Sequence, residues 1–201
     1  MYLTLLSAVK EGEKNSEKSL GQVARAISMG SLMGARGNSG VILSQVFRGI
    51  AKELEGKEQA NANDLALALK AGADTAYEAV MKPVEGTILT VIREIAVRCE
   101  KEAKNGSDIM ETLVAGVENG YKTLARTPSM LPILKEAGVV DAGGQGLIYL
   151  IEGVIEGLAN QNAIELEVYR DRLKADDKLK AMREHVELEF QYCTGLLSII
   201  E

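Results

Sequence analysis

Three glycine-rich segments of this chain have the residue types of phosphate-binding or nucleotide-binding turns. The first is Gly34-Ala35-Arg36-Gly37-Asn38-Ser39-Gly40, which leads into an apolar helical pattern at residues 41–54. Such a junction presents unpaired backbone N–H groups and the positive end of the helix dipole, and both attract anions. We expect Asn38 or Ser39 to be the N-cap residue, and the glycines to let the backbone approach a ligand closely. Taken alone, a segment of this kind is more often a loop with a helix cap.

The second segment is Lys82-Pro83-Val84-Glu85-Gly86-Thr87, where one helical pattern ends and the next begins. Thr87 is a natural N-cap residue, and its hydroxyl could equally contact a phosphate or the edge of a base. An interhelical turn with a cap is the simpler explanation of this segment when no other observation supports a ligand.

The third segment is Gly138-Val139-Val140-Asp141-Ala142-Gly143-Gly144-Gln145-Gly146, with three glycines in four residues beside one carboxylate. A helix opening rarely needs so many glycines, so we interpret them as allowing close approach of a flat ligand. All three segments precede helices. In an antiparallel bundle, helices whose N-termini share one end gather their loops there, which predicts a single nucleotide-sized site.

The elements that must position these segments are helices. Ala, Leu, Ile, Val, Glu and Lys dominate the composition, and aromatic residues make up 4% of it. Because the intervening loops are short, we predict an all-α, up-and-down helical bundle. Asn63 or Asp64 is the predicted start of one helix of this bundle, and a capping box between Asp108 and Glu111 is predicted at the start of another. Apolar helical patterns occur near residues 3–9, 20–27, 41–54, 65–80, 88–95, 109–124, 129–136 and 146–159.

The pattern changes at the C-terminal end of the sequence. We assign residues 1–162 to the helical domain and the highly charged residues 163–182 to a connector. Residues 183–201 contain Val186, Leu188, Phe190 and Tyr192 at alternate positions, which is the period of a half-buried strand. We therefore expect this strand to begin a second, incomplete domain.

Composition and residue types exclude several classes of function. A net charge of −6 with scattered basic residues argues against nucleic acid as a partner, and no apolar run is long enough to span a membrane. Cys99 and Cys193 are far apart, and Cys99 is expected to be a small buried hydrophobe in a cytoplasmic protein. There is no Walker-type loop, and His185 is the only histidine. We assign no catalytic residue and no metal ligand, since the three segments contain only two carboxylates, Glu85 and Asp141.

The three segments resemble the DhaL-type nucleotide-binding domain, which is the ATP-binding domain of dihydroxyacetone (glycerone) kinases. The resemblance covers residues 1–162 and is greatest to the N-terminal domain of the FakA-type fatty acid kinases, also called Dak phosphatase or YloV-like proteins. It implies a helical barrel of eight helices that binds ADP or ATP with Mg²⁺ at one end. It places the phosphates at Gly37, Asn38, Ser39 and Gly40, and the adenosine between Thr87 and Ile88 on one side and Asp141, Gly143 and Gly144 on the other.

The resemblance also implies partners and a difference from the family. In the fatty acid kinases the phosphoryl acceptor is carried by a DegV-family fatty-acid-binding subunit, and in the glycerone kinases it is dihydroxyacetone. The family's magnesium-binding aspartates precede a methionine that corresponds to Met1. We therefore expect this chain to lack those ligands and the first barrel helix, to be inactive as a kinase alone, and to expose an apolar groove that favours a homodimer. Cys193 corresponds to a zinc ligand whose partner histidines are not in this sequence.

The sequence is also compatible with two other functions. The first is a non-catalytic module that senses nucleotide or acts as a scaffold for a partner. The second is a structural helical bundle whose glycine-rich loops bind nothing.

Overall fold

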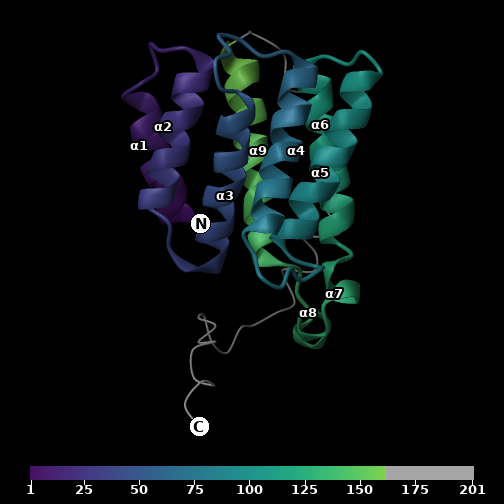
Figure 1. Cartoon of the computed structure of the whole chain (residues 1–201). Helices are drawn as coiled ribbons and strands as arrows, with labels where there is room; N and C mark the ends of the chain where they lie inside the picture. Colours follow the sequence, from purple (N-terminus) through teal and green to yellow (C-terminus); the bar gives the residue numbers. More distant parts are fainter. Residues whose placement is uncertain (162–201) are drawn as a thin grey trace.

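The computed structural model describes residues 1–161, and its regular structure there is entirely α-helical (Figure 1). This confirms the predicted all-α class. The predicted connector at 163–182 and strand at 183–201 lie outside the described residues. The helices within residues 1–161 are α1 (Tyr2–Glu13), α2 (Leu20–Met33), α3 (Gly37–Glu53), α4 (Ala62–Glu78), α5 (Ile88–Lys104), α6 (Ile109–Leu124), α7 (Thr127–Met130), α8 (Pro132–Ala137) and α9 (Ala142–Gln161).

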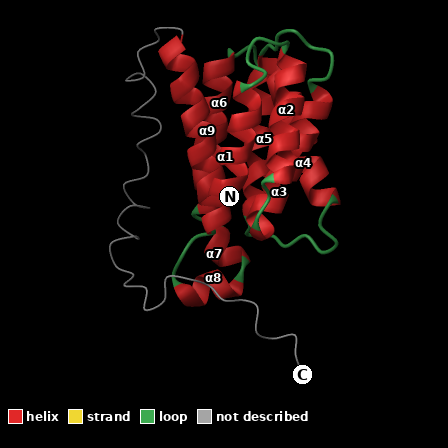
Figure 2. Cartoon of the chain, turned by 90° about the vertical axis from the view of Figure 1, so that its left-hand side faces the viewer, coloured by secondary structure: helices red, strands yellow, loops and turns green. Residues whose placement is uncertain are grey.

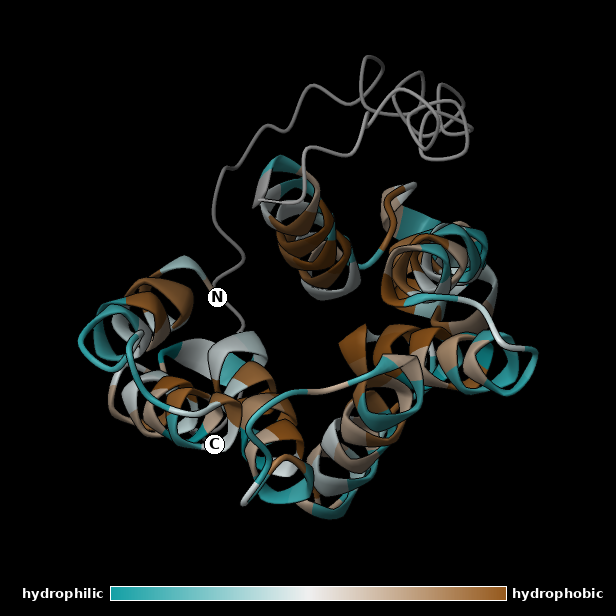
Figure 3. Ribbon diagram, turned by 90° about the horizontal axis from the view of Figure 1, so that it is seen from above, coloured by the Kyte–Doolittle hydropathy of each residue, from teal (hydrophilic) through white to brown (hydrophobic). Residues whose placement is uncertain are grey.

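The long helices run alternately up and down, as the short loops predict. Each of α1 to α5 packs against the helix that follows it, and α9 returns to pack against α5 and α6. Viewed along the helix axes, the long helices form a curved row that starts with α1 and α2 (Figure 3). The short helices α7 and α8 project beyond one end of the long helices (Figure 2). Because neighbouring long helices run in opposite directions, α3, α5 and α9 all begin at the same end of the bundle.

The hydrophobic core is centred on α5. Its buried residues cover most of its circumference and include Ile88, Val91, Ile92 and Ile95. Cys99 is also fully buried there, as expected, and burial raises the pKa of its thiol to about 12. A helix buried on several faces needs neighbours on each of them, and α4, α6 and α9 supply these contacts.

Helix boundaries differ from the sequence prediction where local signals compete. α4 begins at Ala62, one residue before the predicted Asn63, because Asn61 caps it and forms a capping box with Asp64. The predicted box between Asp108 and Glu111 at the start of α6 is confirmed. Residues 129–136 form parts of two short helices, since Leu131 precedes a proline and takes an extended conformation.

The helix α9 begins at Ala142, four residues earlier than predicted. Gly143, Gly144 and Gly146 therefore belong to its first turns and not to a loop. This changes the explanation of these glycines, because a helical glycine is more often required by the packing of a neighbouring helix.

Apolar side chains remain exposed on the outer faces of α1 and α2. Tyr2, Leu6 and Val9 follow one another at helical spacing on α1, and Met29 and Met33 do so on α2. The expected apolar groove and the homodimer both stay predictions. No helix within residues 1–161 is both long enough and apolar enough to cross a membrane.

Candidate functional site

The starts of α3, α5 and α9 meet at one point, which is Gly143. A Cβ atom placed on Gly143 would lie 3.2 Å from Ser39 Oγ at the start of α3 and 3.3 Å from Ile88 Cβ at the start of α5. In Figure 1 the starts of α3, α5 and α9 are at the lower end of the long helices, toward α7 and α8. The predicted convergence of the three glycine-rich segments is therefore confirmed as geometry. The ligand that the segments bind stays a prediction.

The start of α3 carries the free backbone donors of the site. The N-cap residue is Arg36, and its side chain makes no capping hydrogen bond but donates to the carbonyl of Ala35 at 2.7 Å. Gly37, Asn38 and Ser39 are consequently the first helical residues, which corrects the prediction that Asn38 or Ser39 is the N-cap. The N–H groups of a first helical turn have no acceptor within the helix. Together with the helix dipole they form an anion-binding surface.

Glycine occurs at two positions of this segment for different structural reasons. Gly37 has a φ of 67°, which favours glycine, and nothing lies within 4 Å of the place where its Cβ would be. Gly40 is buried, and its Cβ would lie 2.5 Å from Thr4 Oγ1 on α1. Gly37 therefore leaves open space for a ligand, whereas Gly40 is required for α1 to pack against α3.

Thr87 occupies the N-cap position of α5, as predicted, but its hydroxyl is not free. It donates to the carbonyl of Val84 at 2.8 Å and makes no capping hydrogen bond. The preceding Gly86 has a φ of 81°, and a Cβ there would lie 2.9 Å from Cβ of Met130 on α7. The turn before α5 is thus closed on itself and fixed against the projecting helices.

The third opening is capped by Asp141. The N–H group of Gly144 donates to Asp141 Oδ2 at 2.6 Å, and the N–H group of Asp141 donates to Thr127 Oγ1 at 3.1 Å. Burial raises the pKa of the Asp141 carboxyl, while hydrogen bonds from the N–H groups of Gly144 and Ile88 act in the opposite direction. One half-buried carboxylate therefore lies between the starts of α5 and α9.

This arrangement divides the site electrostatically. A carboxylate at the starts of α5 and α9 already accepts their backbone donors and repels a second anion. The start of α3 has no such carboxylate in its first turn. An anionic group is consequently favoured at α3, and hydroxyl or amino groups that donate hydrogen bonds are favoured beside Asp141.

The glycines of α9 do not share one explanation. A Cβ on Gly144 would lie 2.7 Å from Cγ2 of Val91 and 3.2 Å from Cδ1 of Leu124, so Gly144 is required for α9 to pack against α5 and α6. Helix packing is therefore one reason for a glycine at 144, and close approach of a ligand there stays a prediction. Gly143 differs, since its Cβ would fill the point where the three helix starts meet.

Sequence reasoning missed the residues that support the three openings. Thr4 donates to the carbonyl of Gly34 at 3.5 Å, and Thr127 accepts from Asp141 while donating to the carbonyl of Leu124. Both threonines are fully buried. A threonine within an apolar helical pattern is the signal in the sequence that could have identified these residues, because a hydroxyl buried with the apolar residues needs a hydrogen-bond partner that the fold supplies.

The two carboxylates of the predicted segments are both engaged by protein groups. Asp141 is held by backbone N–H groups, and Glu85 is paired with Arg93 at 2.7 Å. Within residues 1–161 no three side chains of His, Cys, Asp or Glu are grouped so that they could hold a metal ion.

Comparison with known proteins agrees with this arrangement. The DAK2 domain matches residues 1–156. The chain is 44% identical to Protein YloV of Bacillus subtilis and 41% identical to the uncharacterized protein SH1689 of Staphylococcus haemolyticus. It is also 40% identical to the uncharacterized protein SAUSA300_1119 of Staphylococcus aureus.

Each of these similarities covers 98% of this chain and 36% of the relative, so the chain spans about a third of the length of the curated proteins it matches. The helical arrangement, the three motifs and the match over residues 1–156 lead to one conclusion: this chain belongs to the DAK2 domain family, whose domains are of the DhaL type.

Proposed function

We propose that this domain binds ADP or ATP where α3, α5 and α9 begin, as the nucleotide-binding part of a kinase of the dihydroxyacetone kinase or fatty acid kinase type. The observation that carries the proposal is the meeting of Ser39, Ile88 and Asp141 around Gly143. Membership of the DAK2 family supports it independently.

The start of α3 binds the phosphates in this proposal. The N–H groups of Gly37, Asn38, Ser39 and Gly40 are the donors of the first helical turn, and the helix dipole adds a partial positive charge. The open space beside Gly37 gives access to them. The bound ATP supplies the γ-phosphoryl group, and these residues hold the phosphates in a fixed orientation.

The starts of α5 and α9 bind the adenosine part. Ile88, which follows Thr87, lies against Gly143, and the Asp141 carboxylate lies 3.1 and 3.3 Å from the Cβ positions of Gly143 and Gly144. Its charge disfavours phosphate here and accepts hydrogen bonds from hydroxyl or amino groups of the nucleoside. The nucleotide is therefore bound in one direction.

The remaining parts of the proposal concern the whole protein. We propose a phosphoryl acceptor held by a separate protein, such as a DegV-family fatty-acid-binding subunit, Mg²⁺ as the ion that accompanies the nucleotide, and a cytoplasmic location. The identity to Protein YloV over 98% of this chain supports a common domain, and it says nothing about the acceptor.

Two matched substitutions test the nucleotide site. Asn38 and Asn63 are both exposed and both occupy the second position of a helix, on α3 and on α4, whose starts lie at opposite ends of the bundle. Aspartate at either position is favourable for the helix dipole, by about 0.3–1 kcal/mol. We expect Asn38→Asp to weaken ADP binding by about tenfold, because the new charge repels phosphate, and Asn63→Asp to leave it unchanged.

Isothermal titration calorimetry with ADP, with and without Mg²⁺, measures the affinities, and urea unfolding compares the stabilities. Failure of the unaltered chain to bind ADP at millimolar concentration under both conditions would overturn the proposal. If the Asn38→Asp and Asn63→Asp variants bound ADP with equal affinity, the phosphates would not be bound at the start of α3. Phosphoryl transfer to an acceptor subunit by the whole protein would support the kinase, whereas ADP binding by a whole protein that transfers no phosphoryl group would identify a nucleotide-sensing module.

A further inference from the structure

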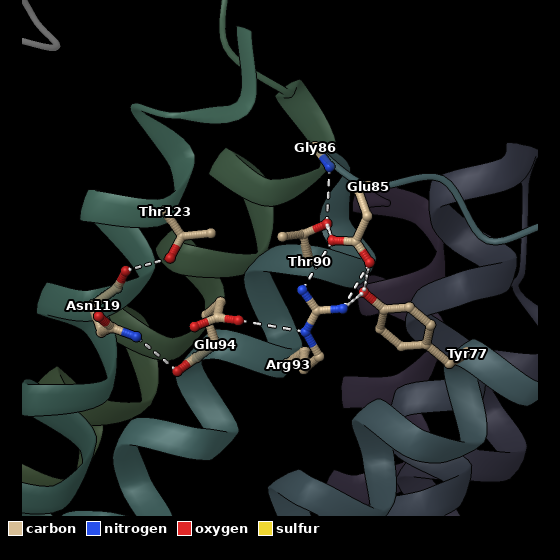
Figure 4. Close-up of polar contacts among 8 residues, drawn as sticks. All are labelled: Tyr77, Glu85, Gly86, Thr90, Arg93, Glu94, Asn119 and Thr123. Carbon is tan, nitrogen blue, oxygen red and sulfur yellow. Dashed lines mark hydrogen bonds and ion pairs between the residues drawn. The ribbon is translucent and has the colours of Figure 1, made fainter. Parts of the chain in front are cut away.

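Arg93 and Glu85 form a two-pronged ion pair on the turn before α5. Arg93 Nη1 donates to Glu85 Oε1 at 2.7 Å, and Nη2 donates to Glu85 Oε2 at 2.9 Å (Figure 4). Arg93 Nη1 also donates to the hydroxyl of Tyr77 on α4 at 2.8 Å, and the guanidinium carbon lies 5.3 Å from the centre of the Tyr77 ring. A planar guanidinium bound by two parallel hydrogen bonds is restricted in direction as well as in distance.

The pair continues into the backbone of the turn through Thr90. The Thr90 hydroxyl donates to Glu85 Oε2 at 2.8 Å and accepts from the N–H group of Gly86 at 2.9 Å. Thr90 is 1% exposed, so its position is fixed by the core. Arg93, Glu85, Thr90 and the Gly86 backbone thus form one connected chain of hydrogen bonds, which Figure 4 shows as a group around the turn.

The position of this network in the molecule indicates a role other than general stability. The side chains of Arg93 and Glu85 are 40% and 51% exposed, and an ion pair at such a surface position contributes little to stability. The network nevertheless ends at Gly86, directly before Thr87 and Ile88. Ile88 Cβ and Asp141 Oδ2 lie 3.3 and 3.1 Å from the place of a Cβ on Gly143, so a shift of the turn would displace one side of the site.

We propose that Arg93 is a positioning residue for the nucleotide site. By holding Glu85 with two hydrogen bonds it fixes the turn at residues 84–87, and with it the place of Thr87 and Ile88 opposite Asp141. Arg93 itself lies outside the site and acts through Glu85. This inference rests on the nucleotide site proposed above and adds the group that holds one side of that site in place.

A second arginine on α5 provides the control. Arg98 pairs with Glu102 at 2.8 Å, is 36% exposed, and lies one and a half turns further along the same helix. Arg93→Met removes the ion pairs with Glu85 and Glu94 and the contacts with Tyr77, and Arg98→Met removes the ion pair with Glu102, so both variants lose surface ion pairs of α5. Arg93→Lys keeps the charge but loses the two-pronged geometry.

We expect Arg93→Met to weaken ADP binding by about tenfold and to speed hydrogen exchange of the Gly86 amide. Arg93→Lys is expected to restore part of both properties, and Arg98→Met to change neither. The midpoints of thermal unfolding of the two methionine variants should be similar. Calorimetry with ADP, amide exchange by NMR and circular dichroism measure the three quantities. If Arg93→Met does not fold, Glu85→Gln carries the same test, because it keeps the side-chain size and weakens the hold of Arg93.

The two proposals fail in different ways. If the unaltered chain does not bind ADP, the proposed function is overturned and this inference falls with it. If the unaltered chain and Arg93→Met bind ADP equally, only the positioning role is overturned. If Gly86 exchanges at the same rate in both, the pair does not hold the turn.

Discussion

Asp141 is the residue whose environment most restricts what the site can bind. Its carboxylate is half-buried, and burial raises its pKa even though two backbone N–H groups stabilise the charge. A carboxyl whose pKa is higher in the folded than in the unfolded protein opposes folding when it is ionised. The ionised Asp141 carboxylate therefore lowers stability, and the binding role that we propose for it would explain its presence.

The substitution Asp141→Asn tests this balance. Asparagine is as good an N-cap as aspartate and carries no charge to desolvate. We expect the variant to unfold at an equal or higher urea concentration than the unaltered chain at pH 7. The difference should vanish as the pH falls through the raised pKa of Asp141, because the unaltered carboxyl is then protonated in the folded state.

The same variant should bind ADP less tightly, since a charged acceptor accepts hydrogen bonds more strongly than an amide. The exposed Asp74 on α4 provides the control, and Asp74→Asn should alter neither stability nor ADP affinity. A marked loss of stability of Asp141→Asn at pH 7 would contradict the assignment, because it would mean that the ionised carboxylate stabilises the fold.

At the scale of single elements, glycine sets how closely α3 and α4 approach. A Cβ on Gly49 would collide with the carbonyl of Ala71, and a Cβ on Gly72 would lie 2.8 Å from the carbonyl oxygen of Val46. The two helices therefore pack with their backbones nearly in contact. This contact places α3, and with it the turn at its start that we propose binds phosphate.

Two glycine-to-alanine substitutions separate packing from helix propensity. Gly49→Ala is expected to lower the free energy of unfolding by about 1–3 kcal/mol, because α3 and α4 must move apart. Gly153 is inside α9 with nothing within 4 Å of its Cβ position, so Gly153→Ala should raise that free energy by about 0.5–1 kcal/mol. Urea unfolding followed by circular dichroism measures both. If Gly49→Ala were as stable as the unaltered chain, the close crossing of α3 and α4 would be wrong.

At the scale of the whole molecule, the helices differ strongly in how much of their surface is buried. α5 is buried over most of its circumference, whereas α8 has no buried residue. The candidate site includes both the start of the buried helix α5 and the turn before it, which packs against the peripheral helix α7. One side of the site is consequently held by the core and the other by the periphery.

Hydrogen exchange should follow this gradient. We expect amides of α8 to exchange by local opening, within minutes, and amides in the middle of α5 to exchange only when the whole domain unfolds. Addition of ADP should slow exchange at residues 37–40 and 86–88 and leave α8 unchanged. Exchange of α8 as slow as that of α5 would contradict the description of α7 and α8 as a peripheral projection.

Local signals in the sequence were sufficient for much of the fold. The helical period and the short loops predict the up-and-down helices, and Asp108 with Glu111 predicts the start of α6, because a cap and its partner are three residues apart. The three glycine-rich segments were also visible. Each precedes a helix, so a shared end was a possible arrangement, and the projection of α7 and α8 beyond the bundle is what leaves α9 running in the same direction as α3 and α5.

Only the tertiary structure decided what each residue of those segments does. Gly144 and Gly40 are glycines because Val91 and Thr4 lie against them, and Glu85 is bound by Arg93 and Tyr77. None of these partners is adjacent in sequence. The period and caps of a helix are set by neighbouring residues, so one sequence reveals them, whereas a contact between two helices depends on how both pack against the rest of the molecule.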